Sequence, residues 1–522
     1  MKIFILFLIV TSVESYKILC LFPYPGKSHY MVFEPILDEL INRGHHLTVV
    51  SFFPATIPLP NRRDVSLQHL APPNVEVLDL KEIYLKTQKY FGLENYFGHM
   101  SIVTSLAKSN LLICERIINS DVFEEFLAGK GEYDLILIEH FNSDCLLSLV
   151  HIYNVPSIGL ISSSMMPWTM ARAGAPDNPA YIPGMTLPFT EKMTFFERLI
   201  NTFTLHFYNT WFEYAIWREE QKIIENKLKR KLPRLSDLGK NSSAVLVNTH
   251  FSINGIRELT PSLIEIGGIH LHNRTIRELN EPLRTLVENA EEGFIIFSFG
   301  SLVKGSSLPR KQMKAIINAF ARLPQTIFWK WEDDISDAIK IPKNVKFEKW
   351  LPQYDLLNQQ NCLAFITHGG LLSLTEAVAS SVPTLIIPIL GDQFGNAAHA
   401  QKAGVAEVLS LTEIEEDVFY NKLLSVLSKE KRQKAKLLTS LWRDRPQPAM
   451  ETALFNIELV ARHKGLDMSS GSRWLSPIQY LLLDIIAFIV FVLFISTFTF
   501  VFILKTFISV VQIYYRNKEK SS

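Results

Sequence analysis

The sequence predicts an α/β protein with two parallel-sheet domains, followed by one transmembrane helix. At 522 residues the chain is too long for one ordinary hydrophobic core, so two domains are expected. Short apolar runs typical of buried strands alternate with amphipathic runs typical of helices, which is the pattern of parallel sheets. Residues 485–504 form a run of about twenty residues without a charge, enough for one helix to cross a bilayer.

Eight buried strands are expected, four in each half of the chain. Those of the first half lie at residues 17–23, 47–53, 135–138 and 244–248. Those of the second half lie at residues 294–298, 326–331, 362–367 and 384–387. No G-x-G-x-x-G pattern follows a strand, which weighs against a dinucleotide-binding dehydrogenase.

The two ends of the chain are apolar for different reasons. Residues 1–15 contain a short apolar run with a small-residue exit, which is typical of a cleaved signal peptide and too short to span a bilayer. Residues 505–522 form a basic tail, expected in the cytosol, so everything before the transmembrane helix is expected in the lumen. The sequence therefore predicts a single-pass type I membrane protein.

Composition narrows the partners and the chemistry. The net charge is +1 with acids and bases interspersed, which argues against nucleic acid. Asn241 and Asn273 begin glycosylation sequons that would face the lumen. The four cysteines are expected to be buried thiols, with no disulfide framework and no metal-binding spacing: Cys20, Cys114, Cys145 and Cys362.

The pattern of residues 350–393 predicts a strand, a glycine turn, a helix and a second strand, with polar residues only where a ligand could reach them. Gly369 and Gly370 let the backbone approach a ligand, and the helix they open offers unpaired N–H groups that suit a diphosphate. His368 and Ser373 can add hydrogen bonds at the same place.

This segment resembles the nucleotide-sugar signature of UDP-glycosyltransferases, the family that includes UDP-glucuronosyltransferases and ceramide galactosyltransferase. The resemblance implies the GT-B fold, in which two Rossmann-like domains face a cleft. Matching positions imply that Trp350 stacks on uracil, that Gln353 bonds near the base and that Glu376 holds the ribose hydroxyls. The phosphate and sugar contacts implied by the resemblance are those of Ser301, His368, Gly370, Ser373, Asp392 and Gln393. Leu372 and Ser381 depart from the family pattern, where asparagine and glycine are usual.

The candidate base lies in the first half. Because ligands sit beyond the carboxyl ends of strands in parallel sheets, His29 and Glu139 can converge, each following a different strand. The resemblance implies that His29 is the general base, and a neutral imidazole can take a proton from a hydroxyl. A carboxylate on the other ring nitrogen would stabilise the imidazolium. Glu139 stands where relatives usually have aspartate, and Asp144 is the alternative.

The chain is expected to divide into seven segments. They are a signal peptide (1–15), an acceptor-binding Rossmann-like domain (16–262), a linker (263–292), a UDP-sugar-binding Rossmann-like domain (293–440), a C-terminal helix returning to the first domain with a juxtamembrane segment (441–484), the transmembrane helix (485–504) and the cytosolic basic tail (505–522). Lys518 and Lys520 resemble the dilysine retrieval signal of endoplasmic reticulum membrane proteins, and a solvated basic stub is the alternative.

The acceptor is expected to be small and lipophilic, because residues 162–183 offer apolar walls that include Met165, Met166, Trp168 and Tyr181. A helical stripe of apolar residues is expected to be core, a lid over the pocket, or a face that rests on the membrane: Leu199, Phe203, Phe207, Trp211 and Tyr214.

The sequence thus predicts an inverting UDP-glycosyltransferase of the endoplasmic reticulum. UDP-sugar is a co-substrate, and no cofactor or metal is expected. Segments 26–29 and 370–373 look most like the arthropod branch, in which glucose is the commoner sugar, with glucuronic acid and galactose left open. Two alternatives remain: a biosynthetic transferase acting on a lipid or pigment, and a non-catalytic UDP-sugar-binding membrane subunit. Whether the chain forms a homo-oligomer is also left open.

Overall fold

The structure is a computed structural model that describes residues 14–71, 78–87, 94–129, 131–334, 340–464 and 466–521. The expected signal peptide lies outside the described residues except for Glu14 and Ser15. The chain divides after Ser469 into two units. The first unit contains both sheets, and the second contains the long C-terminal helix.

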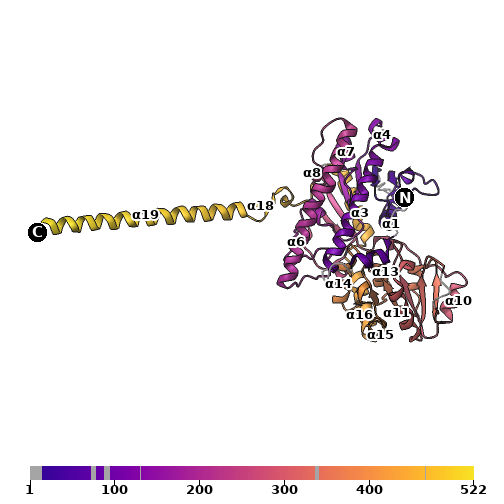
Figure 1. The fold of residues 1–522 in the computed structure, drawn as a ribbon. Helices are drawn as coiled ribbons and strands as arrows, with labels where there is room; N and C mark the ends of the chain where they lie inside the picture. The colour runs from indigo at the N-terminus through magenta and orange to yellow at the C-terminus, as the bar shows by residue number, and fades with distance from the viewer. Residues whose placement is uncertain are drawn as a thin grey trace, which may run out of the picture. The chain divides into compact units, whose positions relative to one another are not determined.

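The first sheet has seven strands in the order β3-β2-β1-β5-β6-β7-β8, and every neighbouring pair is parallel (Figure 1). Its strands are β1 (Lys17–Phe22), β2 (His46–Ser51), β3 (Arg62–Ser66), β5 (Leu135–Glu139), β6 (Ser157–Ile161), β7 (Ala244–Val247) and β8 (Leu263–Glu265). Along β1, Ile18 and Cys20 belong to one core while Leu19 and Leu21 belong to another. After the exposed Lys17 the strand is apolar, because both faces of the sheet are covered.

The second sheet has six strands in the order β12-β11-β9-β13-β14-β15, again all parallel. They are β9 (Phe294–Ser298), β11 (Thr326–Lys330), β12 (Val345–Glu348), β13 (Cys362–Thr367), β14 (Thr384–Ile386) and β15 (Ala406–Val408). A short parallel pair, β4 (Leu78–Asp79) and β10 (Val303–Lys304), links the two halves of the unit. The predicted α/β architecture with two parallel sheets is confirmed.

Helices connect the strands of both sheets. In the first half they are α1 (Lys27–Asn42), α2 (Leu80–Thr87), α3 (Glu94–Ile118), α4 (Asp121–Ala128), α5 (Leu147–Tyr153), α6 (Phe195–Phe212), α7 (Arg218–Leu228), α8 (Leu235–Lys240) and α9 (Phe251–Asn254). In the second half they are α10 (Leu283–Glu288), α11 (Arg310–Ala321), α12 (Gln353–Leu357), α13 (Leu371–Ala379), α14 (Gln393–Lys402), α15 (Glu416–Val426), α16 (Lys429–Arg443) and α17 (Ala449–Arg462).

Helix α17 follows the second sheet in the chain but packs against the first. Its buried residues Met450, Leu454 and Ile457 share a core with Phe33 and Ile36 of α1. Arg43, at the end of α1, also binds carboxylates of α17. The last helix of the first unit therefore fastens the second half of the chain onto the first half.

Two expectations need correction. Residues 263–292 were expected to be a linker, but Leu263–Glu265 forms β8 at the edge of the first sheet and α10 lies at Leu283–Glu288. The cysteines were expected to be thiols, but Cys114 and Cys145 form a disulfide, while Cys20 and Cys362 are free and buried. Both cysteines lie among apolar residues of one core. The expectation failed because the sequence around a buried cysteine looks the same whether it is a free thiol or part of a disulfide.

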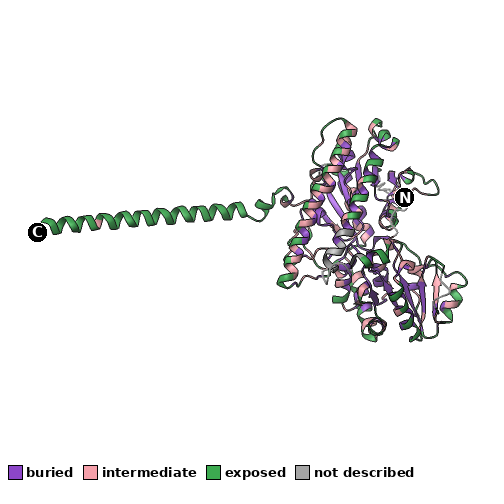
Figure 2. Ribbon diagram, in the orientation of Figure 1, coloured by how far each residue is buried: buried purple, intermediate pink, exposed green. Residues whose placement is uncertain are grey.

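The second unit contains α18 (Pro477–Tyr480) and α19 (Leu483–Ser521). Helix α19 is long and apolar enough to cross a membrane, judged by length and composition. It continues past residue 504 through the basic tail as one helix of 39 residues. Figure 2 shows the central strands of both sheets, such as β5 and β9, as buried and α19 as exposed along nearly its whole length.

Candidate functional site

A cavity of about 470 Å³ is lined by residues from both halves of the first unit. Every residue predicted to contact the donor lines it, as does the predicted base: His29, Ser301, Trp350, Gln353, His368, Gly370, Ser373, Glu376, Asp392 and Gln393. These residues follow strands of both sheets because ligand sites in parallel sheets lie beyond the strand ends.

His29 lies in the first turn of α1, and its Nδ1 atom is 2.9 Å from Oε1 of Glu139 at the end of β5. Glu139 is 2% exposed, whereas the side chain of His29 is 17% exposed. An ionised carboxylate only accepts hydrogen bonds, so the proton belongs on Nδ1 and the lone pair on Nε2. Among the described residues no side chain bonds Nε2, which leaves this atom available to a ligand in the cavity.

Sequence reasoning did not identify a further neighbour of His29. The hydroxyl Oγ of Ser162 lies 2.6 Å from the same Nδ1 atom. Ser162 directly follows β6, and Asn248 after β7 donates to its backbone oxygen. Glu139 was identified because ligands lie beyond the carboxyl ends of parallel strands. Ser162 is also at such a strand end, so the same rule could have identified it from the sequence. Aromatic rings of Tyr24 and Phe141 pack around the imidazole, with centroids 4.6 Å and 4.2 Å away.

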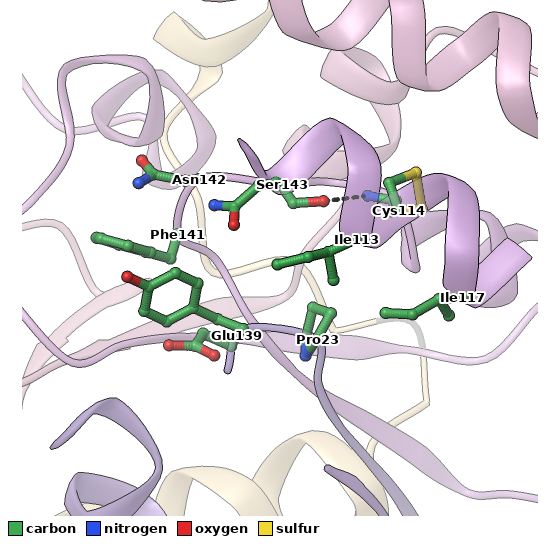
Figure 3. Close-up of a pocket in the computed structure, with 11 residues that line it drawn as sticks. Pro23, Ile113, Cys114, Ile117, Glu139, Phe141, Asn142 and Ser143 are labelled. Carbon is green, nitrogen blue, oxygen red and sulfur yellow. Dashed lines mark hydrogen bonds between the residues drawn. A yellow bond between two sulfur atoms is a disulfide. The ribbon is translucent and has the colours of Figure 1, made fainter. Parts of the chain in front are cut away.

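Glu139 also borders a second cavity of only about 10 Å³, roughly the space of one water probe (Figure 3). Pro23, Ile113 and both disulfide cysteines line this space. The disulfide therefore lies in the wall behind the carboxylate that contacts His29.

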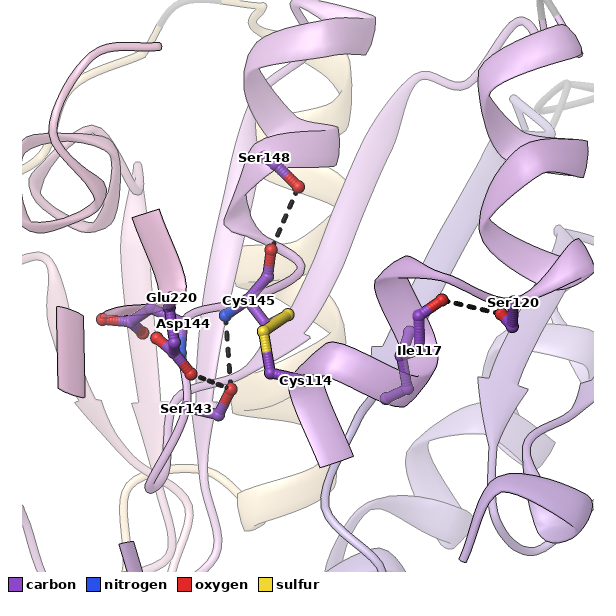
Figure 4. Close-up of a disulfide and its surroundings, with 8 residues drawn as sticks. All are labelled: Cys114, Ile117, Ser120, Ser143, Asp144, Cys145, Ser148 and Glu220. Carbon is purple, nitrogen blue, oxygen red and sulfur yellow. Dashed lines mark hydrogen bonds between the residues drawn. A yellow bond between two sulfur atoms is a disulfide. The ribbon is translucent and has the colours of Figure 1, made fainter. Parts of the chain in front are cut away.

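The loop from residue 141 to 145 is held at three points, by the disulfide, by Glu220 and by Arg172. Figure 4 shows the first two. The disulfide joins Cys145 to Cys114 of α3. The carboxylate of Glu220 accepts hydrogen bonds from the Ser143 hydroxyl and from the backbone N–H of Asp144. The side chain of Asp144 forms a fully buried ion pair with Arg172.

This arrangement gives the two candidate carboxylates, Glu139 and Asp144, different partners. Asp144, the alternative partner of His29, contacts Arg172 instead, and Glu139 is the one that contacts His29. Glu220 is fully buried beside Asp144. Burial raises the pKa of Glu220 to about 8, and the Asp144 carboxylate adds to the effect.

The glycine turn after β13 encloses His368. A Cβ at Gly370 would lie 2.5 Å from Nε2 of His368, and one at Gly300 would lie 2.8 Å from the ring. Only glycine at both positions leaves room for the imidazole. Burial, aided by the charge of Lys330, lowers the pKa of His368 to about 4. His368 is therefore a neutral hydrogen-bonding group near pH 7 rather than a cation.

Glu376 connects several cavity residues. Its carboxylate receives hydrogen bonds from Gln353 Nε2 at 2.6 Å and from Arg274 Nη1 at 2.7 Å. Gln353 Nε2 also lies 3.1 Å from the hydroxyl of Ser373. Burial raises the pKa of Glu376, and Arg274 opposes this. Arg274, which was assigned to the linker, is a cavity residue that the sequence did not reveal because an exposed loop gives no periodic pattern.

Asp392 and Gln393, at the start of α14, line the same cavity. The backbone N–H of Ser164, from the first half, lies 3.4 Å from Oδ2 of Asp392. Burial raises the pKa of Asp392, and the bond from Ser164 opposes this. The side-chain oxygen of Gln393 accepts from the backbone N–H groups of Ile389 and Leu390, which fixes the side chain in place.

Trp350 is 71% exposed and lines the cavity, which excludes a core role. The Nζ atom of Lys330 lies 5.9 Å from the centroid of its ring. An exposed indole at a cavity rim offers a face on which a flat ring can stack.

Apolar side chains from the first half line another part of the cavity: Met31, Val103, Leu106, Phe141, Met166 and Met185. Of the four expected wall residues, Met166 lines the cavity, whereas Met165, Trp168 and Tyr181 do not. Met165 and Trp168 belong to cores, and Tyr181 contacts Glu258. The helical stripe is not core at Leu199, Phe203 and Tyr214, which are 55%, 54% and 57% exposed.

In the described part of the chain, no three His, Cys, Asp or Glu side chains are grouped so that they could hold a metal ion. The two parallel sheets have the architecture of the GT-B fold. Two solved structures match this fold. The glycotransferase of kitacinnamycin has a TM-score of 0.54 at 16% identity and covers 86% of this chain and 99% of its own. Arabidopsis thaliana UGT89C1, complexed with UDP-L-rhamnose, has a TM-score of 0.56 at 13% identity and covers 86% and 100%.

The sequence model of the family described as UDP-glucoronosyl and UDP-glucosyl transferase matches residues 17–520, and the chain belongs to this family. UDP-glucosyltransferase 2 of Dactylopius coccus is 33% identical over 98% of this chain and 96% of its own. UDP-glucuronosyltransferase 1A7 of Mus musculus is 29% identical over 88% and 86%. The protein is therefore a UDP-glycosyltransferase, which transfers a sugar from a UDP-sugar co-substrate to an acceptor.

Proposed function

We propose that this enzyme transfers glucose, with inversion, from UDP-glucose to the hydroxyl of a small lipophilic acceptor, and that His29 is the general base. The observation that carries the proposal is the position of His29. Its Nδ1 atom is bonded to Glu139, and the residue lines the same cavity as the donor-contact residues. The base and the donor-contact residues thus come from different halves of the chain, which allows the acceptor and the departing UDP to be held on opposite sides of the anomeric carbon.

The reaction balances with protein groups and the two substrates. Nε2 of His29 takes the proton of the acceptor hydroxyl as the oxygen bonds to the anomeric carbon. The bond from that carbon to the β-phosphate oxygen breaks, and its electrons leave with UDP. Glu139 stabilises the imidazolium that forms. Neutral His368, the hydroxyl of Ser373 and the N-terminus of α13 stabilise the negative charge on the departing diphosphate.

The charges around the cavity favour a neutral hexose over a glucuronate. Among the described lining residues, the lysine and arginine side chains are those of Arg274, Arg277 and Lys330. Arg274 is bonded to Glu376, and Lys330 to the backbone oxygen of Gly300, both at the nucleotide end. The proposed sugar end holds the half-buried carboxylate of Asp392, which would repel a second carboxylate. The name of the relative UDP-glucosyltransferase 2 is consistent with this choice.

The apolar lining supports the acceptor class. Met31, Met166 and Met185 have flexible side chains, which suit acceptors of varied shape. No lysine or arginine lines this apolar part among the described residues, so a neutral acceptor is favoured over an anionic one.

The proposed location is the endoplasmic reticulum membrane, with the first unit in the lumen and α19 spanning the bilayer. The disulfide supports an oxidising compartment. Asn241 and Asn273 are both exposed, so they are accessible for glycosylation. Lys518 and Lys520 lie in the last turn of α19, where the dilysine signal was expected.

A panel of donors and acceptors tests the proposal. Microsomes that contain the full-length protein are assayed with UDP-glucose, UDP-glucuronate and UDP-galactose against lipophilic phenols, alcohols, carboxylic acids and long-chain lipids. The proposal expects the highest kcat/KM with UDP-glucose and neutral phenols or alcohols. Fastest turnover with UDP-glucuronate would overturn the sugar assignment. Activity on one lipid or pigment alone would favour the biosynthetic alternative, and UDP-sugar binding without turnover would favour a non-catalytic subunit.

A further inference from the structure

A buried asparagine, Asn396 in α14, joins the two halves of the first unit directly behind the donor turn. It is 1% exposed and does not line the cavity. Its Nδ2 atom donates to the backbone oxygen of Gly369 at 3.1 Å. Its Oδ1 atom accepts from Asn254 Nδ2 at 3.1 Å and from Ser164 Oγ at 3.4 Å. One side chain therefore contacts the phosphate turn and two residues of the acceptor half.

The direction of these hydrogen bonds is fixed by a backbone group. The N–H of His250 can only donate, and it donates to Oδ1 of Asn254 at 3.1 Å. The amide of Asn254 must then present Nδ2 to Asn396, which in turn must present Oδ1 to Asn254 and Nδ2 to Gly369. A series of hydrogen bonds with one fixed direction thus runs from the backbone N–H of His250 through the side chains of Asn254 and Asn396 to the backbone oxygen of Gly369. Such series strengthen each member by mutual polarisation.

The last bond of the series determines where a peptide N–H points. In a trans peptide the C=O and the following N–H point in opposite directions. Because the oxygen of Gly369 is turned toward Asn396, the N–H of Gly370 is turned away from it. Gly370 lines the cavity at the start of α13. Asn396 therefore aims a diphosphate-binding N–H at the ligand without touching the ligand.

We propose that Asn396 is a positioning residue that couples docking of the acceptor half to binding of the UDP diphosphate. When Asn254 and Ser164 are in place, they orient the Asn396 amide, and this amide orients the Gly369–Gly370 peptide. When the two halves separate, the amide loses its orienting partners and the peptide is free to rotate. The inference deepens the proposed function and rests on it, since it takes the donor turn as the diphosphate site.

Calorimetric titration of the solubilised full-length protein with UDP alone tests the coupling. Asn396→Ala removes the hydrogen bonds to Gly369, Asn254 and Ser164, together with the one to the Asp392 carboxylate. Loss of the bond that orients the Gly369–Gly370 peptide should weaken UDP binding about five- to tenfold, the effect of one hydrogen bond. Asn254→Asp keeps the acceptor for His250 but loses the donor to Asn396. It should weaken UDP binding about threefold or more, although Asn254 lies in the other half and outside the cavity. The double variant should bind UDP as weakly as Asn396→Ala does, because both changes break the same series.

Asn201→Asp is the matched control. Asn201 is 1% exposed in the first half, and its side chain bonds only backbone groups of that half: Pro179, Ile182 and Gly184. This variant should lose thermal stability while its dissociation constant for UDP stays within about twofold of wild type. If Asn396→Ala does not fold, Asn396→Ser and Asn254→Asp give the same comparison.

Two results would overturn the coupling. In the first, folded Asn396→Ala binds UDP as tightly as wild type. In the second, Asn254→Asp leaves UDP binding unchanged, or its loss of UDP affinity adds fully to that of Asn396→Ala. Either outcome would show that Asn396 supports the donor turn without coupling it to the first half. Failure of the wild-type protein to bind UDP would instead contradict the proposed function, so the two failures are distinguishable.

Discussion

The Nδ1 atom of His29 lies 2.9 Å from Oε1 of Glu139, although 110 residues separate them in the chain. The pair forms because β1 and β5 are adjacent and parallel, so their carboxyl ends meet at one edge of the sheet. The loop after β1 carries His29 on α1, and β5 ends at Glu139 itself.

The first prediction concerns the base. His29→Ala should lower kcat by roughly 10²- to 10⁴-fold with an aliphatic alcohol, because general-base catalysis contributes that much. A phenol of low pKa needs the base less and should show a smaller defect. UDP binding should persist, since the donor contacts lie in the second half. His46→Ala, at an exposed position on β2, is the control. Wild-type rates of His29→Ala on the alcohol would rule out this role.

A second prediction separates the two carboxylates. Glu139→Gln should lower kcat, by less than loss of the base, because it removes the charge that supports the imidazolium. Asp144→Asn should instead cost about 3 to 5 kcal/mol of stability, since it leaves the buried charge of Arg172 unpaired. Steady-state kinetics and thermal unfolding of both variants measure the difference. A folded Asp144→Asn with crippled kcat, beside a normal Glu139→Gln, would show that the carboxylates are assigned the wrong way round.

The pKa of Glu220 makes stability depend on pH. Its pKa is raised from 4.5 to about 8 in the folded protein, so between these values the folded state binds a proton that the unfolded state has released. The contribution of Glu220 to stability is therefore full below pH 4.5 and is lost as pH rises through about 8. The loss is at most about 1.4 kcal/mol per pH unit within this window. Glu220→Gln resembles the protonated acid and should lose less stability than wild type between pH 5 and 8.

Thermal unfolding of wild type and Glu220→Gln across that range measures the effect. The difference in Tm between them should shift in favour of the variant as pH rises. A constant difference would mean that Glu220 is already ionised in the folded state at pH 5.

The donor end gives a prediction about ligand selectivity. Asp392→Ala should raise KM for UDP-glucose about ten- to a hundredfold, the cost of losing a bond to a charged group. Gln393→Ala should raise it about two- to tenfold, the cost of losing a bond to a neutral group. Binding of UDP, which lacks the sugar, should change little. Titration with UDP and with UDP-glucose provides the comparison, and equal loss of both would contradict the assignment to the sugar.

The proposed topology predicts protease protection. Protease added to intact microsomes should remove only residues after the bilayer, and an endoglycosidase should lower the mass if Asn241 or Asn273 is modified. Digestion of the first unit without detergent would show that this unit faces the cytosol and that the proposed topology is wrong. Changing Lys518 and Lys520 to Ser should release the protein from the endoplasmic reticulum, and unchanged retention would show that the two lysines are not required.

The sequence predicted elements whose residues give a local signal. Strand β5 consists of four apolar residues followed by a carboxylate, so both the strand and Glu139 were apparent. Strand β3 was missed because its residues are Arg62, Arg63, Asp64, Val65 and Ser66, and an edge strand needs little apolar surface. Strand β8 was missed because three residues carry too little periodicity to distinguish a strand from a linker.

Pairings between distant segments were less predictable. Ser162 is 133 residues from His29, and only the strand order brings them together. Arg274 reaches Glu376 across 102 residues from a loop with no pattern of its own. The disulfide joins two cysteines in buried positions, where sequence alone favours the simpler interpretation as thiols.

The disulfide also affects when the loop of residues 141–145 becomes fixed during synthesis. Cys114 and Cys145 are 31 residues apart, and both precede Phe294, where the second sheet begins. Under the proposed topology both cysteines enter the oxidising lumen while the donor half is still on the ribosome, and chains fold from the N-terminus as they emerge. The bond can therefore form in the nascent acceptor half, before any nucleotide site exists. A chain made in a reducing cytosol would lack this early constraint, and its loop would depend on Glu220 and Arg172 alone.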